Sequence, residues 1–508
     1  MCFIGLDVGT TNVKALAADE KGRVLAFASS GYQLHIPRDG WYELSPNEMW
    51  TEAKRALASV VKRIPEPVEA IAVSAPGQAV VPVDKSGKTL YPFMTTIDSR
   101  TAKQNEWWKA NVNELESISR TGQAFSPIFT VNKIMWLREN RPDIYEKTWK
   151  FMCVEDYITY QLSGEAVIDY TAAGRSMMFN IHDLRWDSFV LGHADICQEK
   201  LSVTVPATTK IGWIRPEVAE ELGLPPDVQI IAGAHDQACG AIGCRVLRPG
   251  ETMDAIGTVE VVISVLPSVP DSRQLMESHY PCAPHIAQNA YTIMSINQNG
   301  GSLLKWYKNV FCTAEEQYAE QNGLDPYTYI INSSSDRISD MFVLPHINGS
   351  ETPQQDTLSA GAFVRMRAFH SKADITRGVL DSLAYDMRQN IDKIETVSGT
   401  AIHAVRAIGG GSKTPKLLQI KSDVIGRPVM TMEVSEAAAL GAVMLAAVGM
   451  GQYKDIHEAA ENMVHIGKIF EPNLSNRRLY DERYEQYCSL YPALKDFHHR
   501  IAKPGEFA

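Results

Sequence analysis

The sequence predicts an α/β protein of two domains. Its 508 residues exceed what one hydrophobic core commonly organises, so the length favours two domains of ~200–250 residues or three smaller ones. Short apolar runs of strand length alternate with helical patterns along the chain. A strand followed by glycine and a hydroxyl residue occurs once in each half, at Gly9 and Gly257. We therefore expect domains at 1–248 and 249–508.

Composition excludes several functional classes. The 49 Lys and Arg residues against 60 Asp and Glu residues give a net charge of −11, which argues against a broad basic surface for nucleic acid. The eight cysteines include no CxxC pair, a pattern typical of reduced thiols in a cytoplasmic protein. The first residues do not resemble a signal peptide. The most apolar late stretch, 437–448, is shorter than the ~20 residues that span a membrane.

The first half begins with a hairpin pattern. Apolar runs separated by turn residues predict strands over 3–8, 13–18 and 24–29. Ser45 followed by Pro46 and Glu48 predicts the start of a helix that continues to about residue 63. The remaining elements expected in this half are a strand over 69–74 and a helix over 132–140 that ends before Pro142.

A second series of strands and helices is expected from residue 228 onward. We expect a strand over 228–232, a helix that opens near Asp236, and a glycine-interrupted β pattern over 252–265. A strand over 404–408 is followed by helices over 415–425 and 436–448. Tyrosines at helical spacing between 455 and 497 predict a C-terminal helix that packs on the second domain, with an oligomer contact as the alternative role. Residues 503–508 are expected to be disordered.

Two glycine turns could bind phosphate. Asp7 ends a buried strand, and the turn through Thr10, Thr11 and Asn12 can present backbone N–H groups to an anion while the carboxylate holds Mg²⁺. An ordinary hairpin capped by Asp7 is the alternative. Gly257 and Thr258 repeat the pattern, and a simple β-turn is the alternative there. Neither turn is a Walker A loop.

Two further segments suggest chemistry. Gly410, Gly411 and Ser412 lie between a strand and a helix, where the backbone can approach a flat ligand or phosphate closely, although a tight connection would look the same. Asp236 follows a strand at the start of a small-residue helix, where a carboxylate can accept the proton of an attacking hydroxyl. A helix N-cap is the alternative role for Asp236.

These motifs occur in the order of a known family. FIGLDVGTTNVKAL, AGAHDQACGAIG, AIGTVEVVISV and AIGGGSKTPKLLQIKSDVIGRPV are similar to the FGGY carbohydrate kinases, which belong to the sugar kinase/Hsp70/actin superfamily. SPIFTVNKIMWLREN resembles the first family signature, with Lys133 in place and Ile128 as a departure. DITRGVLDSLAYDMRQNID resembles the second, with Gly378 where Ala or Ser is usual. The resemblance covers nearly the whole chain.

The resemblance implies two RNase H-like domains around a deep cleft, with the sugar held mainly by the first and ATP mainly by the second. It implies that Asp236 is the general base and that Asp7 lies near Mg²⁺. The residues that the resemblance assigns to ATP are Thr10, Thr11, Asn12, Gly257, Thr258, Gly410, Gly411 and Ser412.

The segment around Gln78 bears on which sugar is the substrate. The sugar-side segment looks closest to xylulokinases, yet Pro76-Gly77-Gln78 stand where those enzymes carry Gln-Met-His, and glycerol kinases would carry Arg-Glu at the last two positions. Gln78 offers both a donor and an acceptor to hydroxyls, and a sugar acid has no obvious cationic partner here. The residues expected on the substrate side are Gly77, Gln78, Asp98, Asp236 and Gln237.

Several side chains have a competing interpretation. Asp98 could instead form a salt bridge with Arg100 or cap a turn. Glu260 is an unusual acid on a β pattern for which simple solvation is one interpretation, and neither Glu260 nor His235 receives a role. The favoured function is ATP-dependent phosphorylation of a primary hydroxyl of a small sugar or polyol, foremost a ketopentose such as xylulose. The alternatives are a kinase for a tetritol, a ribitol-type polyol or a deoxy sugar, and a non-catalytic ATP-binding member of the superfamily. A homodimer is compatible with the sequence.

Overall fold

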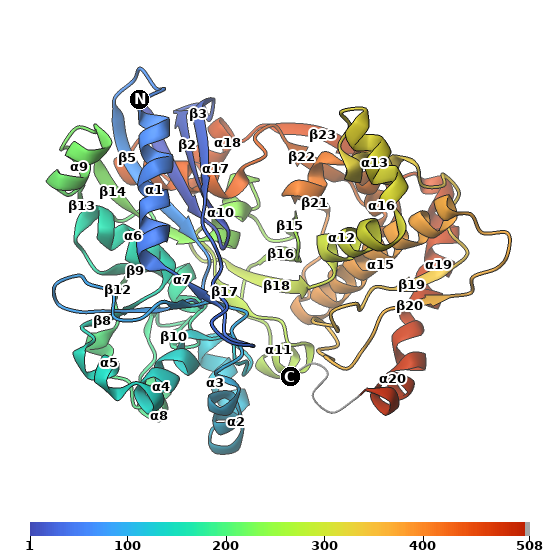
Figure 1. Cartoon of the computed structure of the whole chain (residues 1–508), viewed down its shortest axis with the longest axis horizontal. Coiled ribbons are helices and arrows are strands. Elements are labelled where there is room, and N and C mark those ends of the chain that lie inside the picture. Colours follow the sequence, from blue (N-terminus) through green and yellow to red (C-terminus); the bar gives the residue numbers. More distant parts are fainter. Residues whose placement is uncertain (503–508) are drawn as a thin grey trace.

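Two sheets form the centres of two lobes in the computed structural model, which describes residues 1–502 (Figure 1). The expectation of disorder at 503–508 lies outside the described residues. The six strands of the first sheet, in spatial order, are β13 (Lys210–Trp213), β14 (Gln229–His235), β5 (Val68–Ala75), β1 (Cys2–Val8), β2 (Asn12–Asp19) and β3 (Val24–Gly31). The seven strands of the second are β17 (Cys282–Pro284), β18 (Tyr291–Asn297), β16 (Glu260–Leu266), β15 (Glu251–Ile256), β21 (Ala404–Ile408), β22 (Val429–Met432) and β23 (Ile466–Phe470).

The two sheets share one connectivity. In the first, β1, β2 and β3 are antiparallel neighbours, whereas β5 and β14 run parallel to β1 on its other side. In the second, β15, β16 and β18 are antiparallel, and β21 and β22 run parallel to β15. Each glycine–hydroxyl turn therefore joins the first two strands of its sheet, and the strands expected from the sequence are confirmed.

Helices cover the sheets, and those predicted near 45–63, 132–140, 236, 415–425 and 436–448 are present among them. The helices used below are α1 (Pro46–Val61), α4 (Thr130–Asn140), α6 (Val154–Ser163), α7 (Tyr170–Gly174), α8 (Ser188–Ala194), α10 (Asp236–Gly243), α12 (Gly300–Phe311), α14 (Pro326–Asn332), α15 (Lys372–Ser398), α16 (Pro415–Ile425), α17 (Ala437–Met450), α18 (Ile456–Met463), α19 (Arg477–Cys488) and α20 (Leu490–Ile501). The Ser45 side chain accepts a hydrogen bond from the Glu48 backbone N at 3.3 Å, which confirms the predicted N-cap of α1. No helix within residues 1–502 is long and apolar enough to cross a membrane.

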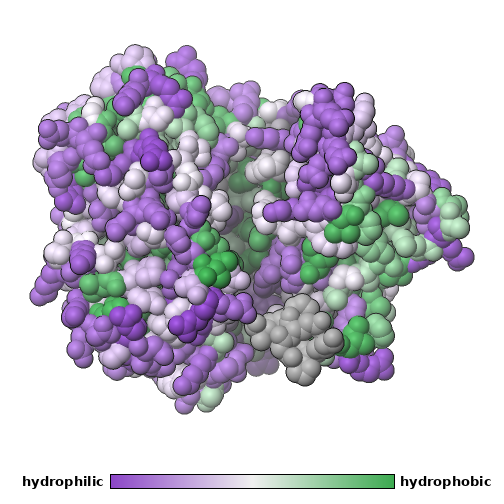
Figure 2. Space-filling view, viewed as in Figure 1, coloured by the Kyte–Doolittle hydropathy of each residue, from purple (hydrophilic) through white to green (hydrophobic). Residues whose placement is uncertain are grey.

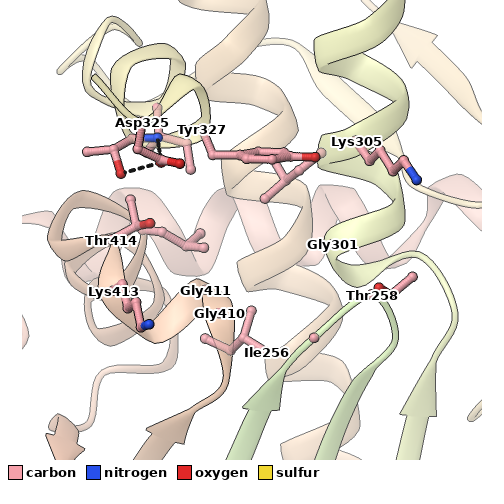
Figure 3. Close-up of a pocket in the computed structure, with 15 residues that line it drawn as sticks. Ile256, Thr258, Gly301, Lys305, Asp325, Tyr327, Gly410, Gly411, Lys413 and Thr414 are labelled. Atoms are coloured by element: carbon pink, nitrogen blue, oxygen red, sulfur yellow. Dashed lines mark hydrogen bonds between the residues drawn. The ribbon is translucent and has the colours of Figure 1, made fainter. Parts of the chain in front are cut away.

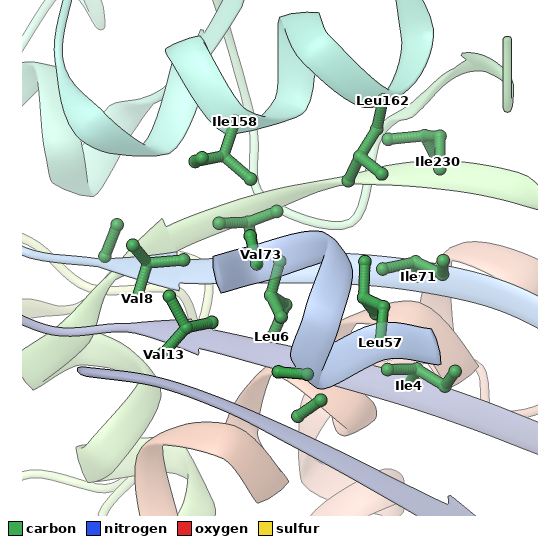
Figure 4. Packing of buried hydrophobic residues seen from close by; sticks show 14 of the residues in the cluster. Ile4, Leu6, Val8, Val13, Leu57, Ile71, Val73, Ile158, Leu162 and Ile230 are labelled. Atoms are coloured by element: carbon green, nitrogen blue, oxygen red, sulfur yellow. The ribbon is translucent and has the colours of Figure 1, made fainter. Parts of the chain in front are cut away.

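The first sheet is buried on both faces. One face carries Leu6 and Val73, toward which Leu57 of α1 and Ile158 of α6 point (Figure 4). The opposite face carries Phe3 and packs against α10 and α17. Helix α17 follows residue 248 in the sequence, yet it lies on the sheet of the first lobe. It therefore joins the two lobes.

The contact between α10 and α17 depends on glycine. A Cβ atom on Gly441 would lie 2.0 Å from the Cys239 carbonyl oxygen, and one on Gly243 would lie 1.9 Å from the Ala437 carbonyl oxygen. A Cβ on Gly5 of β1 would likewise lie 2.0 Å from the Ala439 carbonyl oxygen. Only residues without a side chain allow the backbones to approach this closely.

The C-terminal segment differs in part from the expectation of one helix. It forms α19 and α20, which are separated at Ser489. Pro492 has no N–H to donate to the Cys488 carbonyl, so the helical hydrogen bonding is interrupted there. Tyr480 and Tyr487 are buried beside Tyr385 of α15, so the predicted packing on the second lobe is confirmed.

Candidate active site

The cleft between the lobes is visible as a hollow in the molecular surface (Figure 2). On the side of the first lobe, the parallel strands β1, β5 and β14 end at the same edge of their sheet. Asp7 lies near the end of β1, Ser74 lies opposite it on β5, and Asp236 directly follows β14. The Ser74 hydroxyl donates to Asp7 Oδ1 at 2.9 Å. The topology therefore brings together two acids that are 229 positions apart in the sequence (7 and 236).

Both acids are desolvated by the walls of the cleft. Desolvation raises the pKa of Asp7 to about 6, Lys14 opposes this shift, and the charge of Asp236 adds to it. Desolvation also raises the pKa of Asp236 to about 6, against a hydrogen bond from the Gln237 backbone N at 2.6 Å and the charge of Arg175. A carboxylate with a pKa near neutrality is suited to accept and release a proton.

His235 lies beside Asp236 as a neutral ring. Its Nε2 is 3.4 Å from Asp236 Oδ1. Burial, together with the charge of Arg175, lowers the pKa of His235 to about 3. The imidazole therefore carries no charge at neutral pH and cannot form a salt bridge with the aspartate there.

The loop after β5 carries Gly77 and Gln78. Gln78 is 5% exposed and has φ of +66°, a conformation that non-glycine residues seldom adopt. Lys133 of α4 is fully buried, and its Nζ donates to the carbonyl oxygens of Gln78 and Ile128, both at 2.8 Å. Burial lowers the pKa of Lys133 to about 7. The lysine of the first signature thus fixes the backbone of the substrate-side loop.

A buried cation also lies at this loop, contrary to the expectation from the sequence. Arg175, just after α7, is 4% exposed, and its Nη1 donates to Gln123 Oε1 at 3.0 Å. Its Nε and Nη2 lie 3.0 and 2.8 Å from the end of the Gln78 amide, which is assigned as the oxygen because both atoms are donors. The sequence prediction that a sugar acid has no cationic partner here is therefore wrong. Arg175 is distant in sequence from the loop, and only the fold brings the two together.

The other predicted substrate-side residues have mixed surroundings. Both Asp98 carboxylate oxygens bind the Arg100 guanidinium, at 2.7 and 2.6 Å, and Oδ2 also accepts from the Tyr42 backbone N at 2.8 Å. The salt bridge considered as an alternative is therefore present. Gln237 lines a small cavity between the lobes, and its buried side-chain oxygen has no partner within residues 1–502.

A cavity of about 620 Å³ opens on the second lobe (Figure 3). It brings together Gly257 and Thr258 of one predicted turn with Gly410 and Gly411 of the other. Ile256 and Tyr327 lie on opposite sides of the space, which suits a flat ligand. Further lining residues from α12, α14 and α16 that the sequence did not indicate are Gly301, Leu304, Lys305, Thr328, Ile331 and Leu417, together with Asp325, Lys413 and Thr414 beside them.

Not all predicted nucleotide residues line this cavity. The Ser412 hydroxyl donates to the Gly409 carbonyl at 2.7 Å, which stabilises the loop itself. The turn formed by Thr10, Thr11 and Asn12 belongs to the first lobe, where both threonines are exposed. The two predicted phosphate turns thus lie on different lobes, and a role for each in binding remains a prediction.

Glu260, to which the sequence assigns no role, lies directly behind the second turn and is buried, so solvation does not account for it. Its carboxylate pairs with Lys421 of α16, and Lys421 Nζ also donates to Asp254 Oδ2 at 2.6 Å. Burial raises the pKa of Glu260. The lysine connects the strands β15 and β16 to the helix that follows the glycine loop.

Comparison with known families decides the class of this site. Residues 2–243 match the N-terminal domain, and residues 255–450 the C-terminal domain, of the FGGY family of carbohydrate kinases. The chain belongs to this family. It is therefore a carbohydrate kinase, a phosphotransferase with an alcohol group as acceptor and ATP as donor.

Individual relatives match the kinase over nearly its whole length. It is 28% identical to a xylulose kinase of Staphylococcus epidermidis over 97% of both chains. It is also 28% identical to a gluconokinase of Bacillus subtilis, over 91% of this chain and 90% of the relative. A solved xylulose kinase of Lactobacillus acidophilus superposes with a TM-score of 0.89 at 22% identity, over 99% of this chain and all of that one. The predicted two-domain, actin-like ATPase fold is thereby confirmed.

Proposed function

We propose that the kinase phosphorylates a primary hydroxyl of a ketopentose such as xylulose, with Asp236 as the general base. The observation that carries this proposal is the position of Asp236, which directly follows β14 at the edge of the cleft. The preceding residue, His235, adjoins the loop of Gln78, because a Cβ built on Gly77 would lie 3.0 Å from its Cδ2. The whole-length similarity to xylulose kinases supports the sugar. A second candidate is an aldonic acid, because Arg175 supplies a buried cation and a gluconokinase is among the relatives.

In the proposed reaction, the residues of the chain position the substrates and move one proton. Asp236 accepts a hydrogen bond from the primary hydroxyl and takes its proton as the oxygen attacks the γ-phosphorus of ATP. The bond between the γ-phosphorus and the bridging oxygen breaks, and ADP leaves with that oxygen. The backbone N–H groups of the turns at Gly9 and Gly257 bind the phosphates from opposite lobes. Movement of the lobes toward each other excludes water, which would otherwise accept the phosphoryl group.

Asp7 is the residue proposed to hold Mg²⁺. It fits a hard cation because its carboxylate is desolvated and Ser74 is its only side-chain hydrogen-bond partner within residues 1–502. Among these residues, no group of three His, Cys, Asp or Glu side chains could hold a metal, so water and phosphate oxygens would complete the coordination. When bound, Mg²⁺ neutralises negative charge on the phosphates.

A coupled assay of ADP release across a substrate panel tests the proposal. The panel contains ketopentoses, aldonic acids, pentitols and glycerol at matched concentrations. We expect the highest kcat/KM with a ketopentose. The highest value with an aldonic acid would support the second candidate instead. ADP release that no member of the panel stimulates would contradict a sugar kinase function.

The activity is expected to fall in acid. Asp236 accepts a proton only in its ionised form, and its pKa is raised to about 6. Lowering the pH through this value protonates the base, so kcat/KM should decrease by about tenfold per pH unit below it. Because Asp7 titrates in the same range, the measured value belongs to the pair. Initial rates from about pH 8 to about pH 5 test this, and a flat profile would contradict it.

Replacing Gly410 with valine is expected to weaken ATP binding selectively. Gly410 lines the 620 Å³ cavity, and a Cβ added there meets no atom within 4 Å. The new side chain therefore occupies ligand space without disturbing the fold. We expect KM for ATP to rise by about tenfold or more, with KM for the sugar and the melting temperature unchanged. An unchanged KM for ATP would place the nucleotide elsewhere.

Two further proposals rest on the sequence. A cytoplasmic location follows from the cysteine pattern, and in the structure Cys197 is exposed while most of the others are buried. A homodimer through the C-terminal segment is the second. Sedimentation of the purified kinase would test the dimer, since a monomer at micromolar concentration would contradict it.

A further inference from the structure

The backbone carbonyl of Gln78 is fixed by hydrogen bonds from side chains of α4. In addition to Lys133, the Thr130 hydroxyl donates to the Gln78 carbonyl oxygen, at 3.2 Å. Gly77 packs directly on the stem of Arg175, because a Cβ on this glycine would lie 2.7 Å from Arg175 Cβ. The loop therefore presents the Gln78 side chain from a fixed position.

The guanidinium of Arg175 is also fixed. Its Nη1 donates to Gln123 Oε1 at 3.0 Å, and Gln123 Nε2 donates in turn to the Cys282 carbonyl of the second lobe at 2.9 Å. No carboxylate lies within ion-pair distance of Arg175 among residues 1–502. A buried charge that has only neutral hydrogen-bond partners is costly, so an electron-rich ligand beside it is favoured.

These neighbours determine the orientation of the Gln78 amide. Assigned from these neighbours, the amide has its oxygen toward Arg175, where it accepts from Nε at 3.0 Å and from Nη2 at 2.8 Å, and its nitrogen toward the Gly77 carbonyl, to which it donates at 2.8 Å. An amide oxygen has two lone pairs, and an amide nitrogen has two hydrogens. Both lone pairs are used, and one N–H remains. In this orientation Gln78 has only a donor left, whereas the sequence predicts both a donor and an acceptor.

We infer that Arg175 is a positioning residue that makes Gln78 a pure hydrogen-bond donor and thereby selects substrates with an acceptor oxygen at this point. Such an oxygen is the carbonyl of a ketose or the carboxylate of an aldonic acid. The corresponding polyol is disfavoured. This inference rests on the proposed function, because it concerns the substrate of the same site.

The discrimination has a simple physical origin. A carbonyl or carboxylate oxygen accepts the remaining N–H of Gln78 and brings no proton of its own. A hydroxyl brings a proton that needs an acceptor, and the Gln78 oxygen is already occupied by Arg175. A buried donor without a partner lowers binding, which corresponds to roughly 10- to 100-fold in kcat/KM.

The test compares kcat/KM for a ketopentose, for the two pentitols formed by reducing its carbonyl, and for an aldonic acid. Ratios of kcat/KM do not depend on the fraction of active enzyme. In the wild type, we expect the ketopentose or the aldonic acid to exceed the pentitols by about tenfold or more. The preferred acceptor substrate identifies which oxygen is recognised. In Arg175→Met the Gln78 amide is free to rotate and to accept a hydrogen bond from a substrate hydroxyl. The ratio of kcat/KM for the ketopentose or aldonic acid to kcat/KM for the pentitols should therefore fall to about threefold or less.

A second variant keeps the inference testable if Arg175→Met does not fold. Gln78→Glu is isosteric and keeps both bonds to Arg175, but it has no N–H to donate. The ketopentose or aldonic acid should therefore lose about tenfold or more in kcat/KM, and the pentitols should lose less. Arg377→Met is the matched control, because Arg377 is equally buried but lies on α15 beside Asp381. Its ratio should equal that of the wild type.

The outcomes separate the two proposals. Equal kcat/KM for the ketopentose and its pentitols in the wild type would overturn the inference alone. An unchanged ratio in both Arg175→Met and Gln78→Glu would do the same. A wild type that phosphorylates none of these compounds would overturn the proposed function, and the inference with it.

Discussion

Replacing Asp236 with asparagine is expected to lower kcat for sugar phosphorylation by about 10²–10⁴-fold. The amide keeps the shape of the side chain. Its oxygen can still accept the hydrogen bond that Asp236 Oδ1 accepts in the wild type from the Gln237 backbone N, at 2.6 Å. It cannot accept the proton of the attacking hydroxyl. A coupled assay measures kcat, and calorimetric titration with ADP measures nucleotide affinity, which should stay within about twofold.

Asp187→Asn is the matched control for this variant. Asp187 is also buried, but its side chain caps α8 by accepting from the Val190 N at 3.0 Å, a bond that asparagine can also accept. The substitution removes the acceptor for Asn180 Nδ2, which concerns the fold around α8 and not the reacting groups. Its turnover should equal that of the wild type. Near-wild-type turnover in Asp236→Asn would contradict the assignment of the base. A combined loss of turnover and ADP affinity would indicate a structural role instead.

Replacing Gly441 with alanine should destabilise the fold strongly. The added Cβ would lie 2.0 Å from the Cys239 carbonyl oxygen, which is backbone and cannot rotate away. Helices α10 and α17 must then separate, and the expected loss in the free energy of unfolding is about 3 kcal/mol or more. Activity should fall as well, because Asp236 is the first residue of α10. Urea denaturation followed by circular dichroism measures the change.

Gly192→Ala provides the comparison. This glycine lies in α8, and a Cβ added there meets no atom within 4 Å. Alanine is the better helix former, so this variant should be neutral or more stable by up to ~1 kcal/mol. If Gly441→Ala were as stable as the wild type, the close approach of the two helices could not be a tight constraint.

Local patterns predicted much of the fold. The strands around Gly9 and Gly257 are short apolar runs bounded by turn residues, and the N-cap of α1 is a local signal at Ser45. Asp7 and Asp236 were found in the same way, because each lies at the end of a buried strand. Periodicity and turn chemistry act over a few residues, so the sequence shows them directly.

Residues that depend on distant contacts were missed. The sequence leaves Glu260 without a role because its partner, Lys421, is 161 positions away. Arg175 and Gln78 are neighbours only after α7 packs beside the first sheet. Tyr327 follows the N-cap Asp325 and Pro326 at the start of α14, yet no local feature of the sequence shows that this helix borders the 620 Å³ cavity. Tertiary packing determines these placements, and a single sequence does not encode them locally.

Because α17 packs on the sheet of the first lobe, the two lobes of the kinase are not independent domains joined by a linker. The boundary proposed from the sequence lies at residue 248, whereas the apolar layer formed by Phe3, Ala72 and Val443 contains residues from both sides of it. A fragment that stopped at residue 248 would lack α17, which covers this layer, and would expose its hydrophobic side chains to water. The chain therefore passes from one lobe to the other and back, and the hydrophobic core on this face of the first sheet is complete only when both halves are present.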